Sequence, residues 1–179
     1  MLSLERLSKV YRIGAFGGKE LKAVSDVSFD VRDEEIVALI GESGSGKTTI
    51  GKMILRLLAA SSGRILFDGE DISGLEGRAL KEYRRKVQGV FQDPFSSFNP
   101  IFKADRAFGV IQEEFFPAVK AEDWDLKTEE ALNAVGLNPG QVLGKYPHQL
   151  SGGQLQRFLI ARALLLDIRF LVADEITSM

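Results

Sequence analysis

The sequence predicts an α/β fold, and three observations carry that prediction. Apolar, β-branched runs such as Ile36–Ile40 predict short buried strands. Segments with apolar residues at every third or fourth position, such as Thr48–Leu58, alternate with these runs and predict helices. The last apolar run, Phe170–Ala173, is continuous, which is typical of a strand buried on both faces of a parallel sheet.

Size, charge and composition limit the possible classes of protein. A chain of 179 residues, 45% of them hydrophobic, can bury the core of one domain with room for an inserted lobe. Lys and Arg (23) nearly balance Asp and Glu (25), and the net charge of −2 argues against nucleic acid as the main partner. The absence of cysteine excludes disulfides and cysteine metal sites, and it fits a reducing compartment. Met1–Tyr11 is too charged for a signal peptide, and charges at Arg162, Asp167 and Arg169 exclude a membrane span over Phe158–Ala173.

The N-terminal part is expected to be rich in β structure. Leu2, Leu4 and Leu7 share one short candidate strand, and apolar residues alternate with polar ones over Val27–Val31, as in a half-buried antiparallel strand. The elements expected around them are a loop at Gly14–Gly18, a turn at Ser61–Gly63, a strand over Arg64–Asp68, a turn at Gly69 and a helix over Glu76–Arg85.

The middle section is expected to form a helical lobe separate from the α/β core. A short apolar strand, Val87–Phe91, ends before a loop bracketed by Pro94 and Pro100. This loop is too short and too rich in Ser and Asn to bury both Phe95 and Phe98 fully, so exposed aromatic rings that mark a partner site are expected in it. The alternative is that both rings pack under the helical lobe. The helices expected beyond it are Ala104–Phe116, Leu126–Val135 with Gly136 as its C-cap, and Gly152–Leu166.

The glycine-rich segment Gly41–Thr48 matches the pattern G-x-x-x-x-G-K-[ST]. Glycine lets the backbone wind tightly, so that successive N–H groups point at phosphate oxygens. The alternative is a Gly/Ser-rich turn that binds no ligand. A phosphate-binding loop of this pattern lies between a strand and a helix, and the apolar run before it and the helical segment after it predict those two elements. Lys47 is expected to reach the β- and γ-phosphates, and the Thr48 hydroxyl suits Mg²⁺.

A second motif, Leu150–Gln154, follows about a hundred residues later and opens a predicted helix, another N-terminus that attracts anions. With these motifs in this order, the chain resembles the nucleotide-binding subunit of an ATP-binding cassette (ABC) transporter. The resemblance implies an α/β fold of the P-loop NTPase type, with a RecA-like core, an antiparallel β subdomain and an inserted α-helical subdomain. It also implies a single ABC ATPase domain over residues 1–179, with 1–92 and 151–179 in the core and β subdomain and about 93–150 in the helical subdomain. ATP and Mg²⁺ are the implied cofactors.

Polar residues at two strand ends are candidates for the chemistry. Asp174 and Glu175 follow the carboxyl end of the last expected strand, which is where ligands bind in open α/β sheets. The alternative is that they are two surface acids without a function. The resemblance implies that Asp174 helps to hold Mg²⁺ and that Glu175 orients and deprotonates the attacking water. Gln92 matches the Q-loop glutamine of the family, which contacts Mg²⁺ and that water; otherwise its amide satisfies a loop carbonyl. The stretch Phe91–Pro100 resembles the Q-loop of the oligopeptide, dipeptide and nickel importer group.

Aromatic residues and the lone histidine complete the candidates. Tyr11 lies near the end of the first strand, where the family places an aromatic ring that stacks on adenine, a contact worth roughly 1–3 kcal/mol. The alternative is an ordinary amphipathic tyrosine at a strand end. Phe16 is a poorer candidate in the same region. His148 precedes the second motif, whereas the family's switch histidine follows the Asp–Glu pair, so His148 is interpreted as structural.

The expected site is therefore defined residue by residue. Catalytic roles fall to Glu175 and Gln92, and Mg²⁺ contacts fall to Thr48, Gln92 and Asp174. The residues expected to contact the nucleotide are Tyr11, Gly41, Glu42, Ser43, Gly44, Ser45, Gly46, Lys47, Thr48, Thr49, Ser151, Gly152, Gly153 and Gln154.

The resemblance also implies partners and a cellular role. Two subunits are expected to meet head to tail, so that Ser151 and the N–H groups of Gly152–Gln154 face the nucleotide of a second ATP-binding subunit, identical or different. Transmembrane permease subunits are the other expected partners, no nucleic acid is expected, and the location is the cytoplasmic face of the cell membrane, as a peripheral protein. The expected function couples ATP binding and hydrolysis to transport, in this group peptide import.

The resemblance covers only part of the family domain. The family's D-loop aspartate and switch histidine would follow Met179, so the chain is expected to be a truncated domain, incomplete at the C-terminus, that hydrolyses ATP weakly or not at all. Two alternatives stay open: a non-catalytic or truncated nucleotide-binding module, and a soluble ABC ATPase of DNA repair or translation.

Overall fold

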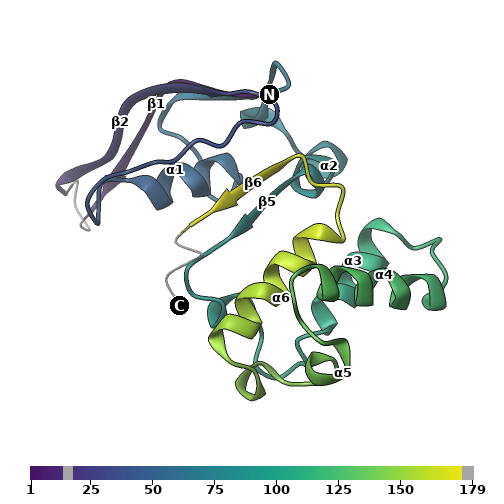
Figure 1. Cartoon of the computed structure of the whole chain (residues 1–179). Coiled ribbons are helices and arrows are strands. Elements are labelled where there is room, and N and C mark those ends of the chain that lie inside the picture. Colours follow the sequence, from purple (N-terminus) through teal and green to yellow (C-terminus); the bar gives the residue numbers. More distant parts are fainter. Residues whose placement is uncertain (14–17, 175–179) are drawn as a thin grey trace. The chain divides into compact units, whose positions relative to one another are not determined.

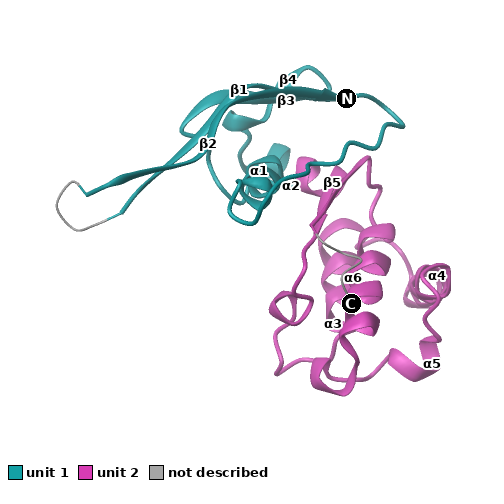
Figure 2. Cartoon of the chain, turned by 60° about the vertical axis from the view of Figure 1, so that its left-hand side comes forward, with its two compact units in different colours: residues 1–81 teal, residues 82–179 magenta. Residues whose placement is uncertain are grey.

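The computed structural model describes residues 1–13 and 18–174. The chain divides into two compact units, residues 1–81 (unit 1) and residues 82–179 (unit 2), drawn teal and magenta in Figure 2. The helix α2 (Gly77–Lys86) begins in the first unit and ends in the second. Most of the loop expected at Gly14–Gly18 lies outside the described residues.

Unit 1 is built on a four-stranded antiparallel sheet in the order β2-β1-β3-β4 (Figure 1). Its strands are β1 (Leu2–Arg12), β2 (Glu20–Val31), β3 (Ser62–Phe67) and β4 (Glu70–Asp71). These confirm the strands expected in the N-terminal part. Leu2, Leu4 and Leu7 are fully buried because they share the inner face of β1.

Two residues in left-handed backbone conformation interrupt the pairing of β1 with β2. Arg6 has φ 47° and Asp26 has φ 53°, and the register shifts near each of them. The Arg6 N–H donates to Ser28 Oγ at 2.8 Å, and the Asp26 N–H donates to Ser8 Oγ at 2.9 Å. A serine hydroxyl thus replaces the lost ladder partner at each bulge, and such bulges increase the twist of a hairpin.

The helix after the glycine-rich segment is shorter than expected. α1 runs over Lys47–Ile54 and buries Ile50, Met53 and Ile54, but it does not reach Leu58. Arg56 adopts φ 54°, which ends the helix, and Leu57 is 60% exposed instead of continuing the apolar face. Apolar spacing alone does not show where the backbone leaves the helical region.

The expected strand over Ile36–Ile40 is not formed in this structure. These residues follow the turn after β2 without regular structure, and Ile36 and Ile40 are 97% and 95% exposed. An extended segment counts as a strand only when a neighbouring strand accepts and donates its backbone hydrogen bonds. Among the described residues, neither sheet includes this segment.

Unit 2 contains a parallel pair of strands, β5 (Val87–Val90) and β6 (Phe170–Ala173), which confirms both expected strands. β6 alternates half-buried and exposed residues, with Leu171 38% exposed, so the expectation of burial on both faces is wrong here. The reason is the small size of the sheet: within the described part of the chain, β5 is the one strand paired with β6.

The rest of unit 2 is mainly helical (Figure 1), and the larger of the two buried clusters that its described residues form contains Phe158. Phe158 is completely buried, stacks on Phe108 with ring centroids 4.4 Å apart, and meets the edge of Phe98 at 5.9 Å. Gly136 (φ 71°) follows the end of α4, as expected for a C-cap. The helices are α3 (Arg106–Phe115), α4 (Ala121–Ala134), α5 (Pro139–Val142) and α6 (Gly152–Leu164).

Among the described residues, no helix has both the length and the apolar character that crossing a bilayer requires.

Candidate functional site

The glycine-rich segment forms a tight loop that lies directly against the hairpin of unit 1. Gly44 and Gly46 have φ values of 82° and 96°, a region that side chains disfavour. A Cβ on Gly46 would stand 2.4 Å from the Ala23 carbonyl oxygen of β2, so only glycine fits this contact. The loop is therefore fixed at its C-terminal end by close backbone packing.

The ammonium group of Lys47 closes the loop. Its Nζ donates to the carbonyl oxygens of Gly41 and Glu42, both at 2.8 Å, and to Ser45 Oγ at 3.4 Å. These contacts hold the positive charge of Lys47 against the residues that begin the loop, Gly41 and Glu42. A cation so placed attracts a polyphosphate.

The N-terminus of α1 adds oriented N–H donors to that charge. Gly46 is the N-cap and has no side chain with which to cap the helix, and the first turn contains no acidic residue. N–H groups at a helix N-terminus need partners, and the helix dipole favours anions there. Most residues that the sequence predicts to contact the nucleotide in this loop are exposed: Gly41, Glu42, Ser43, Gly44, Ser45 and Thr48. Gly46 is buried, and Lys47 and Thr49 are half-buried.

Tyr11 lies on β1, in the same β1–β2 hairpin against which the glycine-rich loop packs. It is half-buried and pairs with Leu21 across the β1–β2 ladder. Leu21 is two residues from Ala23, which contacts Gly46, and two residues of strand span about 7 Å. The β1–β2 hairpin therefore carries Tyr11 and also the strand against which the glycine-rich loop packs.

In unit 2, two of the expected polar residues lie at the same edge of the parallel pair. Val90 pairs with Ala173, and the Asp174 N–H donates to the Val90 carbonyl at 2.9 Å, so Gln92 and Asp174 both follow the carboxyl ends of adjacent strands. Glu175 lies outside the described residues.

Hydroxyl, amide and carboxylate oxygens are hard donors of the kind that Mg²⁺ prefers. In unit 2, Gln92 and Asp174 offer an amide and a carboxylate oxygen, and in unit 1 the exposed Thr48 offers a hydroxyl. No group of three or more His, Cys, Asp or Glu in the described chain is placed to hold a metal ion.

The second motif begins α6 with a reciprocal cap. Ser151 Oγ accepts from the Gln154 N–H at 3.2 Å, and Gln154 Oε1 accepts from the Ser151 N–H at 2.9 Å. A Cβ on Gly153 would meet nothing within 4 Å, so the packing of the chain does not require glycine there. The arrangement is a self-capped helix start with free space beside Gly153.

The structure identifies a linking residue that the sequence did not indicate. Gln156 of α6 is 5% exposed, and its Nε2 donates to the Phe91 carbonyl at 3.4 Å, immediately before Gln92. Its Oε1 has no hydrogen-bond partner in the described part of the chain. The amide thus joins the helix of the second motif to the Gln92 loop. A polar residue among the apolar positions of α6 was the available signal.

His148, interpreted from the sequence as structural, lies at the surface of unit 2. It is exposed, and its ring stacks on Tyr146 at a centroid distance of 5.7 Å.

The loop after β5 exposes one aromatic ring and packs the other. Phe95 is 48% exposed, whereas Phe98 is half-buried against Phe158. Neither ring is fully buried, as expected, but Phe98 packs against the buried cluster around Phe158 and Phe95 does not. Further along, a shallow pocket of about 400 Å³ is lined by Ile101, Phe102, Lys103, Asp105, Arg106 and Tyr146.

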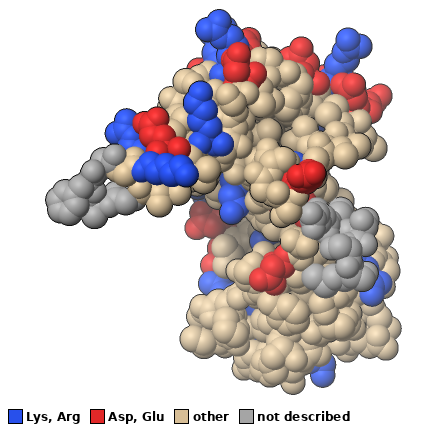
Figure 3. Space-filling view, turned by 90° about the vertical axis from the view of Figure 1, so that its left-hand side faces the viewer, with Lys and Arg blue, Asp and Glu red and all other residues tan. Residues whose placement is uncertain are grey.

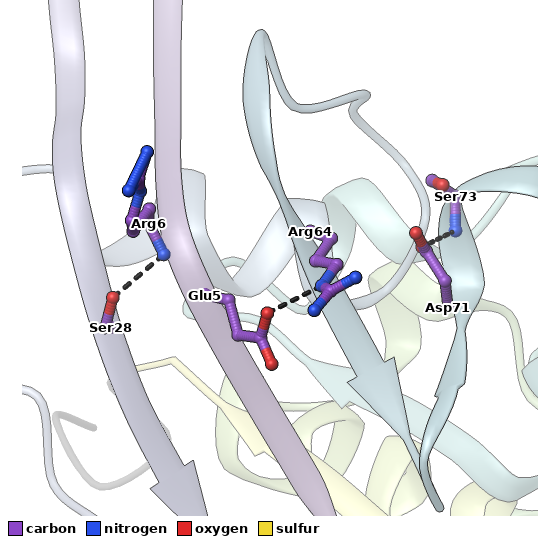
Figure 4. A network of polar contacts seen from close by, with 6 residues as sticks. All are labelled: Glu5, Arg6, Ser28, Arg64, Asp71 and Ser73. Carbon is purple, nitrogen blue, oxygen red and sulfur yellow. Dashed lines mark hydrogen bonds and ion pairs between the residues drawn. The ribbon is translucent and has the colours of Figure 1, made fainter.

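Charged side chains of both signs lie on the face of the molecule that Figure 3 presents. Figure 3 shows blue and red side chains intermixed on unit 1 and few charges on the face of unit 2 that it presents. In unit 1, Arg64 Nε lies 2.6 Å from Glu5 Oε2 across β1 and β3 (Figure 4), and this contact raises the pKa of Arg64. The backbone N–H of Ser73 lowers the pKa of Asp71. Burial lowers the pKa of Arg162 on α6.

Comparison with known proteins gives consistent matches. A family model described as ABC transporter matches residues 24–178. The oligopeptide transport ATP-binding protein OppF of Streptococcus mutans is 44% identical over 156 residues, which are 87% of this chain and 50% of that protein. A putative peptide import ATP-binding protein of Brucella ovis is 42% identical over 182 residues, covering 99% of this chain and 55% of the relative. This chain thus spans about half the length of these curated relatives.

A solved structure supports the same fold. The ATP-binding cassette MJ0796, in a dimeric post-hydrolysis state bound to ADP and Pi, superposes with a TM-score of 0.88 at 29% identity, over 99% of this chain and 75% of that one. This confirms the P-loop NTPase fold expected from the sequence.

Proposed function

The chain belongs to the ABC transporter family, and from that premise we propose that it is the ATP-binding part of a peptide importer. The observation that carries the proposal is the loop before α1, where Lys47 and the uncapped helix N-terminus converge on one point. This combination of fixed charge and oriented N–H groups suits the phosphates of ATP.

Each expected residue has a role in this proposal. The loop Gly41–Thr49 binds the phosphates, chiefly through backbone N–H groups and Lys47, and Tyr11 stacks on the adenine. Gln92 and Asp174, with Thr48, supply oxygen ligands for Mg²⁺, which when bound neutralises charge on the transferred phosphoryl group. Glu175 orients the attacking water and accepts its proton.

The second motif is proposed to act on the nucleotide of another subunit. The capping box holds Ser151 in a fixed orientation while its hydroxyl proton stays available to an outside acceptor. The open backbone at Gly153 permits a close approach by phosphate oxygens. The dimeric structures of MJ0796 support a partner of the same kind. In this scheme bound ATP holds two subunits together, and hydrolysis releases them.

Unit 2 is proposed to contact a transmembrane permease at the cytoplasmic face of the membrane. Exposed apolar side chains gather in the segment after β5: Phe95, Ile101 and Phe102 are 48%, 77% and 53% exposed. Exposed apolar groups beside a pocket are typical of a partner site. The peptide importers among the relatives make a peptide permease the natural partner.

The test of nucleotide binding compares two lysines of one helix. Lys47→Ala removes the positive charge over the loop, so calorimetry should detect no binding of MgATP. Lys52→Ala, in the last turn of α1, removes the same charge at an exposed position and should bind MgATP as the unaltered chain does. If Lys47→Ala keeps its affinity, or both variants lose it equally, the proposed site is wrong.

A further inference from the structure

The side chain of Lys9 covers one face of the Tyr11 ring. Its Nζ lies 5.3 Å from the ring centroid, within the range of a cation–π contact. The two residues are separated by one position on β1, so their side chains emerge on the same face of the strand. Any planar group that stacks on Tyr11 must therefore use the opposite face.

The ammonium group is itself held in place. Lys9 Nζ donates to the Ala59 carbonyl at 2.7 Å, fifty positions along the chain and just beyond α1. A charged donor on a backbone carbonyl makes a strong hydrogen bond. Lys9 thus has one contact on the segment after the phosphate-loop helix and another on the aromatic ring.

The strand that carries both residues is tied to the same segment. The Val10 N–H donates to Ser61 Oγ at 3.0 Å, Ser61 Oγ donates to the Val10 carbonyl at 3.3 Å, and the Ser61 N–H donates to the Ser8 carbonyl at 2.9 Å. Because Ser61 and Ala59 follow α1 closely, the end of β1 is fixed relative to that helix.

We propose that Lys9 is a positioning residue: it fixes the Tyr11 ring against one face so that the other face receives the adenine base. This proposal rests on the proposed function, since it takes the loop before α1 as the phosphate site. A ring that is already held loses less conformational freedom on binding, so the base binds more tightly than it would to a mobile side chain. Lys9 does not touch the phosphates in this scheme.

The test separates the base from the phosphates. Affinities for MgATP and for inorganic tripolyphosphate are measured by calorimetry on the unaltered chain and on Lys9→Met. Loss of the cation–π contact should weaken ATP binding roughly two- to five-fold and leave tripolyphosphate binding unchanged. Lys9→Arg keeps a cation over the ring and should restore most of the ATP affinity.

A matched control and a double variant isolate the contact between Lys9 and Tyr11. Lys22→Met removes a charge from the same hairpin, but Lys22 pairs with Val10 and so lies on the opposite face; both affinities should stay unchanged. In a Tyr11→Ala chain, Lys9→Met should cause no further loss, because no ring remains to be held.

Three results would overturn the proposal: an equal loss for ATP and tripolyphosphate, unchanged ATP affinity in Lys9→Met, or an additive loss in the Tyr11→Ala chain. A failure of the proposed function has a different signature, because then the unaltered chain binds neither ATP nor tripolyphosphate.

Discussion

The first turns of α1 and α6 both follow glycine-rich segments, yet they are built in opposite ways. α1 begins after Gly46, a left-handed residue that has no side chain for capping. α6 begins after Ser151, which exchanges two hydrogen bonds with Gln154. The first helix start therefore has no side-chain cap, whereas the second caps itself through Ser151 and Gln154. Similar composition thus gives two differently built helix starts, and we propose that both meet phosphate groups.

The largest difference between the two helix starts is expected when Gly46 and Gly153 are each replaced by alanine. Gly46→Ala forces a side chain into a left-handed conformation and onto the Ala23 carbonyl, so it should cost about 3 kcal/mol or more and abolish MgATP binding. Gly153→Ala meets no neighbour and should keep stability within about 0.5 kcal/mol, with unchanged binding to the single chain. Denaturant unfolding and calorimetry on both variants check this. Equal losses of stability would refute the distinction.

A second contrast, within unit 2, separates a packed ring from an exposed one. Phe98→Ala removes an edge contact on the buried Phe158 and should cost about 2 kcal/mol, less than a fully buried phenylalanine because Phe98 is half-buried. Phe95→Ala should leave stability nearly unchanged and weaken coupling to transport in a complete transporter. Thermal melting of both variants and a transport assay decide the matter; a lower melting temperature for Phe95→Ala would count against the docking role.

The cap of α6 predicts a smaller effect. Ser151→Ala removes the acceptor of the Gln154 N–H and should cost about 1 kcal/mol, with a melting temperature lower by a few degrees. Ser151→Asp keeps an acceptor at the N-cap and should recover most of that stability. An alanine variant as stable as the unaltered chain would show that the cap does not stiffen the helix start.

The smallest effect concerns a third helix start, the 3₁₀ turn that Asp71 caps in unit 1 (Figure 4). The hydrogen bond from the Ser73 N–H lowers the pKa of Asp71 in the folded chain. The cap therefore contributes its full stabilisation when the pH is above the pKa of Asp71 in the unfolded chain, about 3.9. This contribution is lost as the pH falls through the lower pKa of the folded chain. The carboxyl is exposed and screened, so the effect should stay below about 1 kcal/mol. Asp71→Asn should flatten this part of the acid unfolding curve; an unaltered curve would argue against the contribution.

Local patterns predicted the elements whose own residues show a clear apolar or helical pattern, including β5, although its partner β6 lies far along the chain. β1, β2, α2, β5 and α6 agree with expectation to within a few residues, apart from the longer extent of the first two strands. The strand over Ile36–Ile40 failed because strand formation needs a partner that no local pattern reveals. α1 ended early because a single backbone angle, at Arg56, overrides apolar spacing.

The same distinction holds for the candidate site. The loop and Lys47 follow a compact motif, so sequence sufficed to predict their place before a helix. Lys9 and Gln156 act through contacts with Ala59 and Phe91, 50 and 65 positions away, and only the folded chain brings these together. Phe95 and Phe98 lie three positions apart in one short loop, and packing against Phe158 is what distinguishes their burial.

The most direct test of the central claim follows the backbone amides when MgATP is added to the chain. Resonances of Gly44–Thr49 should shift and their hydrogen exchange should slow, because these N–H groups gain phosphate partners at the start of α1. Amides of Gly152–Gln154 should change little while the chain is monomeric, because that helix start is already capped from within. Perturbation confined to α6, or no change at the loop under saturating MgATP, would contradict the account.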